Sequence, residues 1–177
     1  MGLKENWWRF NYHALRWSFL PVAKHALLLS SRVEGEIPNI RPIMLAPVHR
    51  TTADVFAVGD VTKEFISFVS TDSFGHNAVI NYVQRQISTA LGTVIWKEDA
   101  IDNPRRRALQ LAKDVEDRLD RRLITAAFAQ GEYQYDSVDS VEDGLIGLLQ
   151  RYEARHLRQK GHELRIPIVP VGIEYDR

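Results

Sequence analysis

The sequence contains no cysteine among its 177 residues. This absence excludes a thiolate nucleophile, a disulfide framework and a zinc site built on cysteine ligands. It also fits a reducing compartment. Any covalent or acid–base chemistry in this chain must therefore rest on other side chains.

Long uncharged apolar runs are also absent. No segment of 18 or more such residues occurs, so no spanning helix is expected. The apolar N-terminal region does not read as a secretory signal, because Arg9, Arg16 and Lys24 interrupt it. Neither sign of charge predominates, because 23 Lys and Arg balance 23 Asp and Glu. A nucleic-acid partner is therefore not expected.

Four common catalytic signatures do not occur. The sequence has no G-x-S-x-G elbow, no G-x-x-x-x-G-K-[ST] loop, no G-x-G-x-x-G fingerprint and no H-E-x-x-H pair. Serine hydrolases of the elbow type, phosphate-loop enzymes, dinucleotide enzymes and zinc proteases thus lose their usual motifs. No metal and no cofactor are expected.

What the sequence does contain is an alternation of short apolar runs and longer amphipathic segments. Strands are predicted at 42–48, 65–69, 92–96, 123–128 and 166–173, with a possible short strand in the connector 33–40. Helices are predicted from about Ala53, at 77–90, at 104–122 and at 141–160, and residues 130–140 form a polar loop. This order indicates an α/β domain with a mixed, largely parallel sheet flanked by helices. In the helix at 104–122, the residues expected to face the core are Leu109, Ala112, Val115 and Leu119.

The N-terminal segment 6–31 predicts an amphipathic helix, which Pro21 is expected to kink or split. Its apolar stripe comprises Trp8, Tyr12, Leu15, Phe19, Val22, Ala26 and Leu29. Three tryptophans near basic residues favour a helix in the membrane interface, and packing on the domain's own core is the alternative. We therefore expect a membrane-interface helix at 1–32 and a catalytic domain at 33–177. That domain is either C-terminally incomplete or finished by its last strand.

One candidate dyad stands out at the junction of a buried strand and a helix. Asp54 follows His49 by five residues, and the pair begins where the strand 42–48 ends. Open α/β sheets place their sites at the carboxyl ends of strands. A neutral imidazole can take a proton from a hydroxyl, and a carboxylate on its other nitrogen orients the ring. The spacing also occurs by chance, so a helix-capping Asp beside an unrelated His is the alternative.

Four segments, in order, resemble the lysophosphatidate and glycerol-phosphate acyltransferase family, whose members share an H-x-x-x-x-D motif. The first runs from Arg41 to Asp54, and the second, Leu91 to Glu98, has a glycine, an apolar strand and a basic residue. The third, Ala127 to Glu132, is similar to Phe-Pro-Glu-Gly-Thr-Arg, and the fourth is the proline-containing strand Ile166 to Val171. The resemblance spans about residues 33–175.

The resemblance implies roles for these segments. His49 would be the general base and Asp54 the group that orients it. Arg50, Lys97, Gln130 and Gly131 would contact the substrate, with Gly131 in a tight turn. The acyl donor would be acyl-CoA or acyl-carrier protein, and the acceptor a membrane lipid. We therefore expect a membrane-associated protein on the cytoplasmic face.

Three departures from the family pattern bear on the acceptor. Lys97 stands one position early and Glu98 holds the place of the expected Arg. Gln130 replaces a Glu, and Glu132 follows the glycine where an Arg is absent. Two carboxylates would repel a phosphate group. A neutral lipid alcohol is therefore a candidate acyl acceptor, in addition to lysophospholipid and glycerol-phosphate. The Arg105–Arg107 cluster could compensate, although a solvated helix start is the expected position for it.

Two other functions stay open from the sequence. The altered second and third segments could mark a non-catalytic relative that binds lipid or a partner protein. Alternatively, the dyad could act on water in a soluble hydrolase.

Overall fold

The protein has a central sheet in which every described strand pairing is parallel. The computed structural model describes residues 3–26, 33–48, 54–71, 82, 86–96, 103–128 and 143–174. The sheet order is β3-β2-β4-β1-β5. Its strands are β1 (Ile43–Pro47), β2 (Ile66–Thr71), β3 (Val94–Trp96), β4 (Ile124–Ala127) and β5 (Ile168–Val171). The predicted α/β class with a largely parallel sheet is confirmed.

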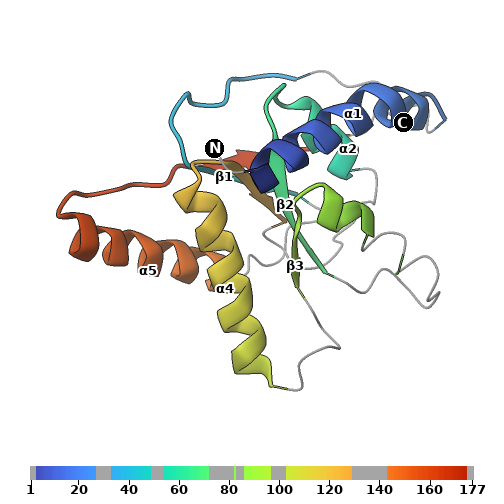
Figure 1. Ribbon diagram of the computed structural model, residues 1–177. Helices are drawn as coiled ribbons and strands as arrows, with labels where there is room; N and C mark the ends of the chain where they lie inside the picture. The colour runs from blue at the N-terminus through green and yellow to red at the C-terminus, as the bar shows by residue number, and fades with distance from the viewer. Residues whose placement is uncertain are drawn as a thin grey trace.

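Helices cover both faces of this sheet. The labelled helices are α1 (Leu3–Ala26), α2 (Asp54–Asp60), α4 (Pro104–Asp120) and α5 (Asp143–Lys160), and residues 86–90 are also helical. Figure 1 shows α1 and α2 on one side of the strands and α4 and α5 on the other. The molecule is thus a three-layer arrangement, as parallel sheets require because both of their faces are apolar.

The two faces of the sheet carry separate apolar cores. Alternation along β1 places Ile43 and Leu45 in the core under α1 and α2, and Met44 in the core under α4 and α5. All three are completely buried. The prediction that this near-continuous apolar run forms a strand buried on both faces is therefore correct.

Local signals explain where α4 begins. The Asn103 side chain accepts hydrogen bonds from the backbone N–H groups of Arg105 (2.9 Å) and Arg106 (3.4 Å), and Pro104 occupies the first turn. Val115 and Leu119 face the core as predicted. The inward position predicted for Leu109 is wrong, because the first turns of α4 extend past the sheet (Figure 1) and leave that side chain 71% exposed.

Helix α1 packs on the core through its first half. Trp8 and Tyr12 are buried, and the Tyr12 ring meets Phe65 edge to face at 5.3 Å between centroids. The Asn11 side chain also donates a hydrogen bond to the Ala90 carbonyl oxygen (3.1 Å). The helix continues through Pro21 without being split. The possible strand at 33–40 is not formed.

Candidate functional site

The carboxyl ends of the strands meet at one edge of the sheet, because all the described pairings are parallel. β1 lies between β4 and β5. One residue past β1, the backbone N–H of Val48 still donates to the Val171 carbonyl oxygen (3.1 Å). The chain is therefore held in the sheet up to the residue before His49.

Asp54 is the described member of the predicted dyad. It begins α2 and its exposed fraction is zero. The partial positive charge at a helix amino terminus favours a carboxylate in the first turn. Burial of that carboxylate in an apolar surrounding demands polar partners. A fully buried Asp is uncommon, and six residues separate Asp54 from the end of β1.

The other predicted site residues lie outside the described part of the chain. These are His49, Arg50, Lys97, Gln130 and Gly131. The described residues that precede them are Val48 after β1, Trp96 at the end of β3, and Phe128 after β4. All three belong to the carboxyl edge of the sheet, so the chain enters each predicted segment from the same edge.

The register of β1 and β4 relates two of these segments. Ile43 pairs with Ile124 and Leu45 with Ala126, so the strands are matched with an offset of 81 residues. The same offset separates position 49 from position 130. β1 and β4 are direct neighbours, which makes the first and third segments of the predicted site continuations of adjacent strands.

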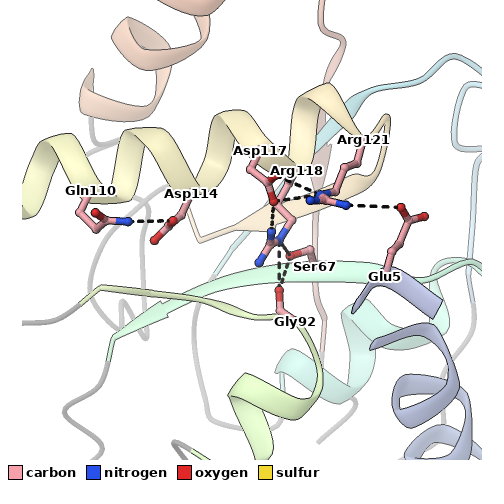
Figure 2. A network of polar contacts seen from close by, with 8 residues as sticks. All are labelled: Glu5, Ser67, Gly92, Gln110, Asp114, Asp117, Arg118 and Arg121. Atoms are coloured by element: carbon pink, nitrogen blue, oxygen red, sulfur yellow. Dashed lines mark hydrogen bonds and ion pairs between the residues drawn. The ribbon is translucent and has the colours of Figure 1, made fainter. Parts of the chain in front are cut away.

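A buried polar network occupies a different part of the molecule (Figure 2). The Arg118 guanidinium donates from Nε to the Ser67 hydroxyl (3.2 Å) and to the Gly92 carbonyl oxygen (3.3 Å). The Ser67 hydroxyl itself donates to Gly92 O at 2.8 Å. Arg118 also pairs with Asp117 and lies over the Trp8 ring, with 4.0 Å from Cζ to the ring centroid.

The network continues to the N-terminal helix. Arg121 pairs with Asp117 at 3.0 Å and with Glu5 at 4.0 Å, and Glu5 pairs with Arg9 at 3.0 Å. Glu5 is buried despite its charge. These contacts tie α1 to the carboxyl-terminal turn of α4.

In this network, burial and the neighbouring opposite charges shift pKa values in opposite directions. Burial lowers the pKa of Arg118, while Asp117 and Asp114 act to raise it. Burial opposes ionisation of Asp117, but Arg121 and Arg118 outweigh it and hold the pKa of Asp117 below its usual value. The hydrogen bond to Asp117 raises the pKa of Arg121. The neighbouring arginines therefore favour the charged form of Asp117.

This network is distant in the topology from the predicted site. Ser67 lies near the start of β2, Gly92 precedes β3, and Arg118 lies at the end of α4, just before β4 begins. These positions belong to the amino edge of the sheet, opposite the edge that Val48 and Phe128 reach. The Arg118 cation thus supports the docking of α1 and is not a phosphate ligand of the predicted site. Sequence reasoning missed it, because an Arg on a charged helix face carries no signal of burial.

Two further properties of the described residues bear on function. No helix among them is long and apolar enough to cross a membrane. No group of three or more His, Asp or Glu side chains in the described ranges is placed to hold a metal ion.

The fold matches that of a solved enzyme. The crystal structure of PlsC, the 1-acyl-sn-glycerophosphate (LPA) acyltransferase from Thermotoga maritima, aligns with a TM-score of 0.60 and 17% identity. The alignment covers 98% of this chain and 71% of PlsC.

The chain shares the fold of PlsC. No family model matches the sequence, and no curated protein matches it. At 17% identity, the likeness to PlsC shows the fold alone.

Proposed function

We propose that this protein is an O-acyltransferase that moves a fatty acyl group from acyl-CoA or acyl-carrier protein to a lipid hydroxyl. The observation that carries the proposal is the fully buried carboxylate of Asp54 at the start of α2, five residues after a histidine that follows β1. The fold shared with an LPA acyltransferase supports it. The acceptor would be a lysophospholipid, a glycerol-phosphate or another lipid alcohol.

The chemistry assigned to the dyad is general base catalysis. The His49 imidazole takes the proton of the acceptor hydroxyl as its oxygen attacks the thioester carbonyl carbon. The C–S bond then breaks, and the departing thiolate recovers the proton from the imidazolium. Asp54 orients the ring and stabilises its positive charge, which gives the buried carboxylate a catalytic role.

The remaining predicted residues would bind the substrate. Gln130 and Gly131 come after β4, the neighbour of β1, in the sequence, and positions 49 and 130 share the 81-residue offset of the β1–β4 register. Lys97 is the next residue in the sequence after β3, which ends at the same edge of the sheet. Arg50 and Lys97 would supply cations, and backbone N–H groups around Gly131 would meet the developing oxyanion.

A second part of the proposal concerns the membrane. The exposed face of α1 carries apolar side chains at alternating spacings of four and three, beginning at position 3. Exposed fractions are 91% for Leu3, 59% for Trp7, 66% for Phe10 and 82% for Trp17. The rings of Trp7 and Phe10 stack at 6.2 Å between centroids. An exposed aromatic stripe of this kind suits the membrane interface.

The proposed membrane-binding residues lie on a different face of α1 from the stripe that the sequence predicts. Trp8 and Tyr12, which head the stripe expected from the sequence, pack inside the protein. The membrane-facing stripe that we propose is Leu3, Trp7, Phe10, Ala14, Trp17 and Pro21, all exposed. It would hold the catalytic domain on the cytoplasmic face of a membrane that supplies the acceptor.

The test is acyl transfer measured by mass spectrometry. Purified protein is given acyl-CoA with vesicles containing lysophospholipid, or with a neutral lipid alcohol. We expect a new ester product from the wild-type protein, none above background from His49→Ala, and at least a hundredfold less from Asp54→Asn. The matched control Asp60→Asn, at the other end of α2, should retain activity.

Two outcomes contradict the proposal. If His49→Ala folds and transfers acyl groups at the wild-type rate, the dyad is not catalytic. Lipid binding with no product from any acceptor identifies a binding protein, and thioester loss without an acceptor identifies a hydrolase.

A further inference from the structure

Two histidines meet at the end of α5, away from the predicted acyl-transfer site. His156 lies in the helix, and His162 follows its last residue, Lys160, by two positions. Their Nε2 atoms are 3.2 Å apart and their rings cross at 81° with centroids 4.9 Å apart. The outer nitrogens of the two rings therefore lie within hydrogen-bond distance of each other.

This separation is that of two ligands on one metal ion. Zinc–nitrogen bonds are about 2.0–2.1 Å long, so two imidazoles at a tetrahedral angle place their nitrogens roughly 3.3 Å apart. The 3.2 Å between the two Nε2 atoms is close to this separation. A single N–H···N hydrogen bond between the rings accounts for the same distance, and the two explanations differ in what happens when a metal is added.

One contact of His162 favours an unprotonated Nε2 on this ring. Its Nδ1 lies 3.3 Å from the Lys160 carbonyl oxygen. If Nδ1 carries the proton and donates to that oxygen, Nε2 of a neutral ring is left unprotonated. Metal-binding histidines usually have their second nitrogen bonded in this way.

We propose that His156 and His162 form a two-histidine site for a borderline divalent transition-metal ion such as Zn²⁺ or Ni²⁺. No third His, Asp or Glu completes a three-ligand group within the described ranges, so water would fill the other positions. The negative end of the α5 dipole favours a cation here. Arg158 and Lys160 in the same turn oppose it, so the affinity should be lower than that of closed sites.

A bound ion would join the last turn of α5 to the segment that leads to β5. Gly161, with φ of 72°, ends α5, and its N–H donates to the Leu157 carbonyl oxygen (2.9 Å). The chain then runs through His162 to β5, the strand beside β1. An ion that joins His156 to His162 would fasten this turn and raise thermal stability, since it binds only the folded arrangement.

The experiment uses the full chain after treatment with a chelator. Titration calorimetry with ZnCl2 and NiCl2 measures the number of bound ions, MgCl2 serves as the negative control, and melting curves are recorded with and without metal. We expect wild-type protein to bind one more equivalent than His156→Ala or His162→Ala. Added metal should raise the melting temperature of the wild-type protein by several degrees more than that of either variant.

The matched control is His25→Ala, which removes an exposed histidine of α1 and should behave as wild type in both assays. The proposal is overturned if the double variant His156→Ala/His162→Ala binds as many ions as the wild-type protein. It is equally overturned if the wild-type protein binds none. Neither measurement depends on acyl transfer, so this site and the proposed enzymatic function fail or succeed separately.

Discussion

At the residue scale, the absence of a side chain at Gly92 leaves room for the ring of Trp8. Gly92 has φ of 69°, a conformation that side chains rarely adopt. A Cβ atom there would lie 2.7 Å from Cδ2 of the Trp8 ring. The ring is meanwhile held by the Arg118 guanidinium on α4. One glycine thus allows an aromatic residue of α1 to reach the polar network at the amino edge of the sheet.

We expect Gly92→Ala to lower the free energy of unfolding by about 2–4 kcal/mol, from the strained φ and the clash together. Chemical denaturation measures this change. In a Trp8→Ala background the clash is gone, so the same substitution should then cost only about 1 kcal/mol. Equal costs in both backgrounds would show that the ring does not limit this position.

Asp117 makes stability sensitive to acid. Its pKa is lowered in the folded protein, where burial is outweighed by Arg121 and Arg118. The stability that it contributes is therefore present above its ordinary pKa of 3.8 and is lost as the pH falls through the lower folded value. We expect Asp117→Asn to be less stable than wild type at pH 7, with the difference shrinking below about pH 4. Melting temperatures across pH 2–7 measure this, and a difference that is constant with pH would contradict it.

At the scale of elements, α1 has two different faces. Trp8 and Tyr12 join the core, whereas Leu3, Trp7, Phe10 and Trp17 are exposed. Glu5 lies on the buried side and is neutralised by Arg9 and Arg121. The helix is therefore both a part of the folded domain and the carrier of an aromatic surface stripe.

If that stripe enters a bilayer, Trp7→Ser/Trp17→Ser should bind vesicles at least tenfold more weakly than the wild-type protein, since each change removes an exposed aromatic ring. Flotation with vesicles that contain anionic lipid measures the bound fraction. Leu109→Ser, which alters an exposed apolar residue of α4, is the matched control and should bind as wild type. Equal flotation of all three proteins would show that the stripe does not contribute to membrane binding.

At the scale of the whole molecule, α1 and the sheet share one apolar core. Trp8 and Tyr12 belong to the same buried cluster as Ile43 and Leu45 of β1. Losing α1 would therefore expose one of the two cores on which β1 depends.

We expect Trp8→Ala to cost roughly 3–5 kcal/mol and a chain lacking residues 1–26 not to fold as a stable domain. Circular dichroism and thermal melting test both expectations. Trp7→Ala, an exposed neighbour on the same helix, should change the stability by less than about 0.5 kcal/mol. A truncated chain that melts like the full one would show that the sheet domain is independent of α1.

The order and type of most elements could be predicted from local pattern. The apolar run of β1 and the Asn103-Pro104 start of α4 are signals within a few residues of the chain. The candidate dyad was also accessible, because His49 and Asp54 flank a strand-to-helix junction that the sequence marks by itself. These features depend on side-chain periodicity and capping, which are local properties.

Tertiary structure alone decided which side of α1 is inside. Periodicity could show that α1 has apolar stripes, but Trp8 and Trp7 are adjacent and equally apolar in the sequence. Trp8 is buried because Gly92, more than eighty residues away, leaves room for its ring and Arg118 covers it. The burial of Arg118, which contacts Ser67 of β2, likewise required the folded chain. Burial and pair distances are set by contacts between elements, and local sequence pattern does not contain them.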